Sequence, residues 1–263
     1  MVDDVKVSCK INLSKTFFTN KPKTIRILNC DATSSTSLAN LFSGSTNIET
    51  IEMKDLNVRN ATDISSMFYR CSGATTIDIA NWNTSSVTYL SNMFSFCMKL
   101  TSLNLSNFNT SKVTDMHNMF SNCRILTSLN LSGFDTTKVN DMSGMFISCY
   151  GLTSLDLSSW DVSNVTNMSS MFTNCRILTS LDLSGFNTSN VTRMNFMFNN
   201  CSGLTSLDLS GWDMTNVNNT TNMFKNCKKL STIRMVGCNS TTKNKIRTAL
   251  SDAGILNQVT IIT

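Results

Sequence analysis

The apolar and polar positions of the chain repeat with a period of 26 residues. A phenylalanine occupies the same place in successive repeats, at Phe42, Phe68, Phe94, Phe120, Phe146, Phe172, Phe198 and Phe224. Leu250 takes the next place, and no insertion or deletion breaks the period from about residue 22 to residue 263. Strict self-similarity at a period of this length is typical of a repeat array.

Each repeat contains the patterns of a strand and of a short helix. From Leu100 to Phe108 apolar and polar residues alternate, which predicts a half-buried strand. The apolar residues that follow have the i, i+3, i+4, i+7 spacing of one helix face, at Met116, Met119, Phe120 and Cys123. Asn, Thr, Ser and Asp between these segments favour caps and turns. Neither element can bury its apolar face alone, so we expect the repeats to stack as rungs.

Ten strand segments can be placed on the array, around Ile25, Ile51, Ile77, Leu103, Leu129, Leu155, Leu181, Leu207, Ile233 and Val259. Parallel strands with a helical return are almost always right-handed. The predicted fold is therefore an α/β repeat solenoid, a right-handed leucine-rich-repeat-like array of 26-residue rungs. It has a parallel β-sheet on one face and short helices on the other.

The two ends depart from the repeat and predict three regions. Residues 1–22 form an N-terminal cap, in which alternating apolar residues between Val5 and Leu13 favour a strand or hairpin. Residues 23–240 form the array, and residues 241–263 form a C-terminal capping helix and the last strand. The helix is expected from Thr242 to Ala253, with Lys245 facing outward and Gly254 as its C-terminal cap.

The segment LTSLDLSSWDVSNVTNMSSMFTNC, residues 152–175, closely resembles the BspA-like family of leucine-rich-repeat surface proteins. The resemblance covers the chain beyond residue 22, and its motif combines LTSLDLS, a Trp or Phe, NVT-x-M and MF-x-x-C. It implies a leucine-rich-repeat-like solenoid and a surface protein with an adhesive or host-binding role. It implies no catalytic residues, because that family has no common active site.

Charge and hydropathy exclude several classes of partner. Only 15% of the residues are charged, the net charge is +5, and the basic residues concentrate at the two ends. A nucleic-acid binder would more often carry one continuous basic stripe, so we expect no nucleic-acid partner. No run of 18 apolar residues is present, which predicts no membrane insertion. We find no signal peptide or anchor motif in this chain, and expect display on a cell surface or a virion surface.

The residues that could support catalysis or bind metal are better explained as structure. A column of cysteines follows the phenylalanines, at Cys71, Cys97, Cys123, Cys149, Cys175, Cys201 and Cys227. Its position on the apolar face favours free buried thiols over the two alternatives, disulfides and metal ligands. Cys30 and Cys238 occupy a second core position. The one histidine, His117, is expected to be solvated and has no nucleophile beside it. We therefore expect a protein that is not an enzyme and that uses no cofactor or metal.

Two columns of polar residues are candidate binding sites. Arg124, Tyr150 and Arg176 follow the column cysteines of consecutive rungs and could form one exposed stripe, with Arg stacked on Tyr. On the sheet face, Asp156, Asp182 and Asp208 would lie about 4.8 Å apart. Like charges so placed are unfavourable, so either a cation or basic partner neutralises them, or nearby serines and water screen them.

Together these observations predict a non-catalytic protein- or glycan-binding repeat module that is displayed on a surface. The alternative is a structural or receptor-binding component of a phage virion. The expected partner is a protein or glycan on a cell surface, or a neighbouring subunit of a larger assembly.

Overall fold

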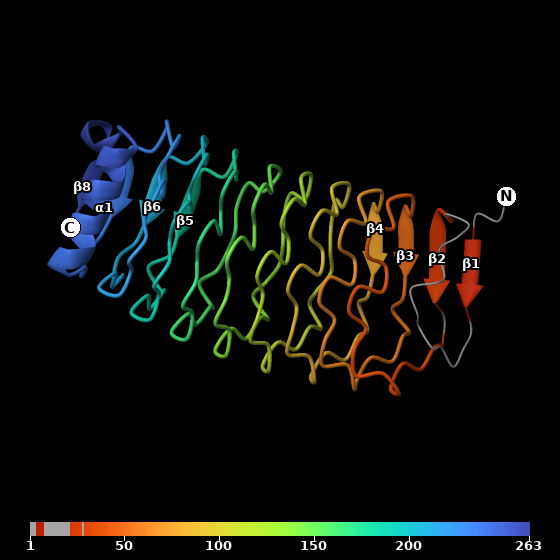
Figure 1. The fold of residues 1–263 in the computed structure, drawn as a ribbon. Coiled ribbons are helices and arrows are strands. Elements are labelled where there is room, and N and C mark those ends of the chain that lie inside the picture. Colours follow the sequence, from red (N-terminus) through yellow and green to blue (C-terminus); the bar gives the residue numbers. More distant parts are fainter. Residues whose placement is uncertain (1–3, 8–21, 28) are drawn as a thin grey trace.

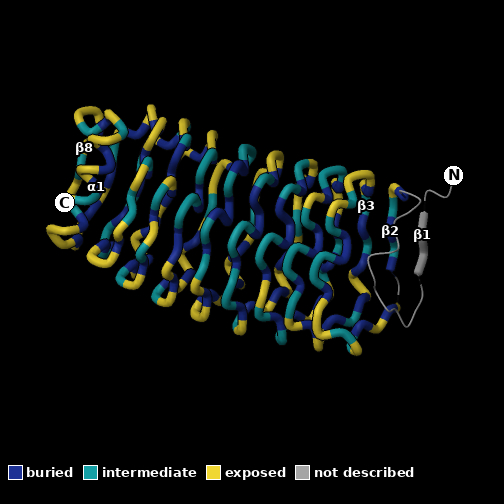
Figure 2. The backbone as a smooth tube through the Cα atoms, in the orientation of Figure 1, coloured by how far each residue is buried: buried dark blue, intermediate teal, exposed yellow. Residues whose placement is uncertain are grey.

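The chain forms one elongated row of stacked rungs (Figure 1). The computed structural model describes residues 4–7, 22–27 and 29–263. About nine turns of 26 residues follow one another, with the first strand at one end and the C-terminal helix at the other. The architecture is a β-solenoid. Exposed residues gather at the turns along the edges of the rungs, whereas buried residues line the interior (Figure 2).

Two parallel sheets lie at the two ends of one face. The first contains β1 (Asp4–Val7), β2 (Thr24–Ile27), β3 (Thr50–Glu52) and β4 (Thr76–Asp78). The second contains β5 (Ser180–Asp182), β6 (Ser206–Asp208), β7 (Thr232–Arg234) and β8 (Thr260–Ile262). Within the array the register advances by one repeat, so that Ile51 lies opposite Ile77. The rest of the alternating N-terminal segment, residues 8–21, lies outside the described residues.

The sheet is interrupted in the middle rungs, so the prediction of strands around Leu103, Leu129 and Leu155 is wrong. Residues 101–105, 127–131 and 153–157 form no strand. The three leucines still pack against the core, but they are only partly buried. The polar residues beside them are mostly exposed, and water can satisfy a main chain that faces solvent. A complete ladder is therefore not required on this face.

A second parallel ladder runs through the segments where the sequence predicts short helices. Single bridges link each rung to the next through Ser37, Asp63, Tyr89, Asp115, Asp141, Asn167, Arg193 and Asn219. The main-chain N–H of Phe120 donates to the carbonyl of Met145, 3.0 Å away in the following rung, and does not form a helical bond. The prediction of a helix in each rung is wrong. Among the described residues the only helices are α1 (Ser240–Asp252) and the short 3₁₀ helix η2 (Leu256–Gln258).

Left-handed backbone positions explain why these segments are not helical. Asn118 and Asn122 have φ values of 55° and 61°, which no α-helix can contain. Asn tolerates this conformation better than most residues, and the repeat places Asn, Ser or Gly at most of the equivalent positions. The apolar spacing nevertheless predicted burial correctly, since Met116, Met119 and Phe120 are completely buried.

The core is a continuous stack of the column phenylalanines. Neighbouring rings are 5.6–5.8 Å apart between centroids and inclined by 3–11° from Phe42 to Phe224. Because this spacing exceeds the strand separation of about 4.8 Å, the rings are offset along the stack, which is a favourable arrangement for aromatic pairs.

The column cysteines are free and buried, and their thiols join the rungs. The Cys123 thiol donates to the carbonyl of Phe94 at 3.2 Å, and the other column cysteines repeat this bond. Cys238 likewise donates to Leu209, 3.2 Å away in the preceding rung. Cys30 is buried, as its core position predicts, and it is disulfide-bonded.

Helix α1 closes the C-terminal end by replacing the bonds of a further rung. The Thr242 hydroxyl accepts from the Met214 N–H at 2.8 Å. Lys245 does not point outward as predicted, because its ammonium donates to the carbonyls of Met214 and Val217 at 2.8 and 2.6 Å. Gly254 follows the helix with a φ of 72°, as expected for a C-terminal cap. Among the described residues, no helix has the length and hydropathy needed to cross a membrane.

Candidate binding surface

The residues that follow three consecutive column cysteines form an arginine–tyrosine–arginine stripe on one turn edge. We define the RYR stripe as Arg124, Tyr150 and Arg176. The Arg176 guanidinium carbon lies 4.7 Å from the centre of the Tyr150 ring, and that of Arg124 lies 5.8 Å from it. Each column cysteine is turned inward, so the next residue is directed away from the core. Both arginines are exposed and Tyr150 is half-buried.

The positive charge of the RYR stripe is not neutralised within the described part of the chain. Ion pairs occur there at Lys23–Glu49, Arg26–Glu52, Asp115–His117 and Asp208–Arg234, and none involves Arg124 or Arg176. The two guanidinium groups therefore keep free donors toward solvent. A guanidinium can form two parallel hydrogen bonds with one carboxylate, so this charge is suited to an acidic group.

Apolar side chains that sequence reasoning missed lie beside the stripe. Ile125 and Ile177 are each 47% exposed, although apolar residues of the repeat are mostly buried. They occupy one repeat position, on either side of Gly151. A β-carbon on Gly151 would lie 2.9 Å from the carbonyl oxygen of Leu126, so a side chain there would require the turn to shift. The sequence does carry a signal for this surface: the Arg-Ile pairs at residues 124–125 and 176–177 stand at the same repeat position as the Tyr-Gly pair at residues 150–151 between them.

The acidic column on the sheet face is already satisfied by local hydrogen bonds. Asp156 accepts from the Ser158 hydroxyl at 2.7 Å and from its main-chain N–H at 3.0 Å. These bonds, the hydroxyl first, lower the pKa of the Asp156 carboxyl. The pKa of Asp182 is lowered in the same way by Ser184.

Asp182 and Asp208 lie opposite each other on β5 and β6, in a shallow hollow that also includes Arg234. Asp208 forms a 3.0 Å ion pair with Arg234. Serine donors therefore stabilise the carboxylates of this column, and Arg234 offsets the charge of one of the three.

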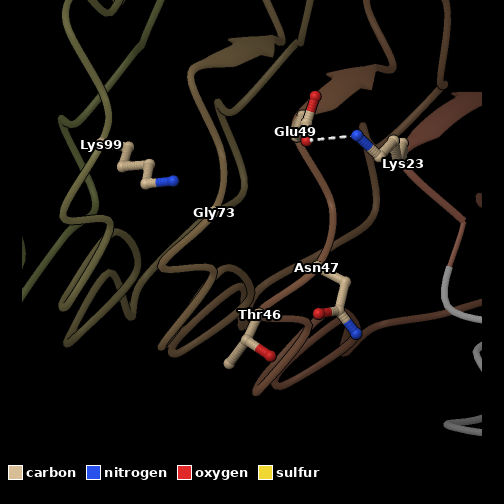
Figure 3. A pocket seen from close by; sticks show the side chains of 6 residues that line it. All are labelled: Lys23, Thr46, Asn47, Glu49, Gly73 and Lys99. Carbon is tan, nitrogen blue, oxygen red and sulfur yellow. Dashed lines mark hydrogen bonds and ion pairs between the residues drawn. The ribbon is translucent and has the colours of Figure 1, made fainter.

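A second shallow hollow lies among the first rungs (Figure 3). It is lined by Lys23, Thr46, Asn47, Glu49, Gly73 and Lys99. Lys23 and Glu49 pair at 3.0 Å beside it, and Gly73 contributes only main chain to its lining. These lining residues include no thiol and no imidazole.

The single histidine has a local structural role. The Nδ1 atom of His117 lies 2.7 Å from the Asp115 carboxylate, and its Nε2 atom lies 3.0 Å from the Asn92 side-chain nitrogen. His117 is therefore half-buried and bonded, where the sequence predicted a solvated residue. The described residues contain no group of three or more His, Cys, Asp or Glu arranged to hold a metal ion.

Three overlapping stretches of the chain, residues 2–76, 71–175 and 150–260, match a family model described as "Mycoplasma protein of unknown function, DUF285". The chain belongs to the DUF285 family. That description assigns no function to the DUF285 family. No curated protein matches the chain.

Solved structures similar to this DUF285 chain are leucine-rich-repeat proteins. An internalin from Listeria monocytogenes is 18% identical with a TM-score of 0.36, and the match covers 83% of this chain and 54% of the internalin. A leucine-rich-repeat protein from Bacteroides ovatus is 16% identical with a TM-score of 0.30, covering 89% and 75%. One from Leptospira interrogans is 12% identical with a TM-score of 0.24, covering 92% and 78%. The chain spans about half the length of the internalin, and no residue role is transferred from these proteins.

Proposed function

We propose that this DUF285 protein is a non-catalytic, surface-displayed binding module whose RYR stripe contacts a protein partner. The observation that carries the proposal is the Tyr150 ring between the guanidinium groups of Arg124 and Arg176, 5.8 and 4.7 Å away. Tyr and Arg are the residue types that most often dominate the energetics of protein interfaces.

The stacking supports binding because it limits the freedom of the side chains before a partner arrives. An unstacked arginine loses rotamer entropy when it is immobilised at an interface, which costs about 0.5–1.5 kcal/mol. Arg124 and Arg176 are partly restrained by Tyr150 in the free protein. Their donors remain available for an acidic group on the partner.

The neighbouring apolar residues favour a protein over a glycan as the partner. Ile125 and Ile177 add exposed apolar surface next to the stripe. Contiguous apolar surface rimmed by polar groups is typical of protein interaction sites. A glycan would make more use of hydrogen-bonding side chains than of two isoleucines.

Positive observations also favour a role without catalysis. Burial raises the pKa of the Cys123 thiol to about 12, so that the thiol is protonated and bonded to a carbonyl. Thiolates, not thiols, are the reactive form of cysteine. His117 is engaged by Asp115 and Asn92.

The surface location follows from the resemblance of residues 152–175 to BspA-like repeats. Display on a phage particle, the alternative location, would use the same stripe.

A display selection tests the proposed function. A random peptide library is selected against the full chain, and the enriched peptides are measured for affinity. We expect R124S/Y150S/R176S to lose at least about tenfold in affinity, as in the truncation of interface hot spots, with an unchanged melting temperature. The matched control, D156N/D182N, changes the other candidate surface and should bind normally. Failure to enrich any peptide, or equal binding by the stripe variant, would contradict the proposal.

A further inference from the structure

A second arginine–aromatic cluster lies in earlier rungs, at backbone positions that most side chains avoid. The residue before each column cysteine has a positive φ. In most rungs it is Asn or Ser, at Asn122, Ser148, Asn174, Asn200 and Asn226, with φ between 56° and 64°. The exceptions are Arg70 and Phe96, in adjacent rungs, with φ of 58° and 62°. Long and aromatic side chains are uncommon in this left-handed region, which is strained for them.

The main-chain bonds of the fold do not require these two side chains. The Arg70 N–H donates to the Ser95 carbonyl at 2.8 Å, and the Phe96 N–H donates to Ser121 at 2.7 Å. Asn174 makes the equivalent bond to the next rung at 2.8 Å. Asn therefore allows the same main-chain hydrogen bond with less strain. Backbone bonding does not explain why Arg70 and Phe96 stand at these positions.

Arg70 and Phe96 both contact the ring of Tyr69. The Arg70 guanidinium carbon lies 5.2 Å from the Tyr69 ring centre and 5.6 Å from the Phe96 ring centre. Tyr69 and Phe96 contact each other edge to face, with centroids 5.8 Å apart and planes inclined by 83°. Arg70 is exposed, and the two rings are half-buried. No ion pair with a carboxylate occupies Arg70 among the described residues.

We propose that Tyr69, Arg70 and Phe96 form a second binding site, for an acidic side chain flanked by apolar residues in a peptide segment of a protein partner. The guanidinium binds the carboxylate, and the two rings contact the apolar neighbours of that carboxylate. Strained residues persist when function retains them, and here the strain places a cation between two rings at the surface. The proposal rests on the proposed protein-binding function but uses different residues, so each can fail separately.

The probe for this site is a short fluorescein-labelled peptide in which Asp and Glu alternate with Leu and Phe. A matched neutral peptide carries Asn and Gln instead. Polarisation titrations at low ionic strength measure the affinity of the full chain for both. We expect the acidic peptide to bind, the neutral peptide to bind much more weakly, and R70N/F96N to lose about tenfold or more in affinity for the acidic peptide.

Asn is the chosen replacement because it should keep or raise the melting temperature while binding is lost. Phe196→Asn is the matched control, since Phe196 also has a positive φ, 58°, and is outside the cluster. It should bind the acidic peptide as the parent does.

Three results would overturn the proposal. The first is a parent protein that does not distinguish the acidic from the neutral peptide. The second is an R70N/F96N variant that binds the acidic peptide normally. If R124S/Y150S/R176S then loses binding, the peptide belongs to the RYR stripe. The third is an R70N/F96N variant that unfolds or melts at a clearly lower temperature, which would make the cluster structural. The proposed function fails on a different result, namely normal binding of selected peptides by the stripe variant.

Discussion

The indole nitrogen of Trp82 donates a 2.7 Å hydrogen bond to the main-chain carbonyl of Met53 in the preceding rung. Trp212 makes the same bond to Leu183 at 2.9 Å. Trp160 occupies the same repeat position, but its buried indole nitrogen has no hydrogen-bond partner within the described residues. The same residue type at one repeat position thus has two different energetic roles.

Replacement by phenylalanine should separate these roles. Phe fits the position, as Phe108 and Phe134 show by being buried there. Trp82→Phe loses a hydrogen bond, whereas Trp160→Phe removes an unsatisfied donor. We predict that Trp82→Phe lowers the free energy of unfolding by about 1–2 kcal/mol more than Trp160→Phe. Urea denaturation measures the difference, and Trp212→Phe should behave like Trp82→Phe. Equal costs for Trp82 and Trp160 would argue against the hydrogen-bond explanation.

The thiol column predicts a loss of stability in alkali. Burial raises the pKa of Cys123 from 9.0 to about 12, and burial also raises the pKa of Cys149 well above 9.0. Below pH 9.0 both the folded and unfolded states hold these protons. Above it only the unfolded chain ionises, so the free energy of unfolding falls by up to about 1.4 kcal/mol per pH unit for each thiol.

Urea denaturation at several pH values on both sides of 9.0 measures this loss. Other groups also titrate in alkali, so a C123A/C149A variant serves as the control. We expect its pH dependence to be shallower than that of the parent. Identical slopes, or rapid labelling of the native thiols, would show that the column is not held protonated by burial.

Burial could be predicted from the sequence because it depends on the period alone. Residues at one repeat position share one environment, which placed Met119 and Phe120 in the core and brought Arg124, Tyr150 and Arg176 into one column. Local conformation could not be predicted in the same way. The spacing i, i+3, i+4, i+7 fits both a helix and a set of stacked turns, and bonds between rungs decide between them. The Asn residues at 118 and 122 were the available signal against a helix.

The candidate surfaces could be predicted only in part, for the same reason. The RYR stripe lies within one column, whereas the contact of Tyr69 and Arg70 with Phe96 joins two columns, whose relative placement depends on the turn geometry. The exposure of Ile125 and Ile177 was missed because an apolar residue in a repeat is ordinarily assigned to the core.

Gly151 should be needed to keep the RYR stripe in place. A β-carbon there would lie 2.9 Å from the Leu126 carbonyl oxygen, so the turn would have to shift. We predict that Gly151→Ala costs about 1–3 kcal/mol, as other overpacking substitutions do. The matched control is Gly185→Ala, whose β-carbon would approach nothing closer than 3.8 Å and should be nearly neutral. Thermal melts of the two variants give the comparison, and equal melting temperatures would contradict it.

His117 should titrate above its ordinary range. The hydrogen bond to Asp115 raises its pKa above 6.5, against a smaller effect of burial, and the charges of Asp115 and Asp141 also raise it. Its contribution to stability is therefore full below pH 6.5 and is lost as the pH rises through the folded pKa. An NMR titration of the imidazole protons should give a value above 6.5 in the parent and a lower one in Asp115→Asn. An unchanged value in that variant would show that the carboxylate is not the cause.

We propose that the partner contacts the arginine–aromatic edge and not the sheet face, and amide hydrogen exchange distinguishes these two surfaces. The full chain is measured alone and with a saturating peptide from the display selection. We expect slower exchange on peptide binding in the turns at residues 124–126, 150–152 and 176–178. Slower exchange confined to β5 and β6, with these turns unchanged, would contradict it and would place the partner on the acidic column.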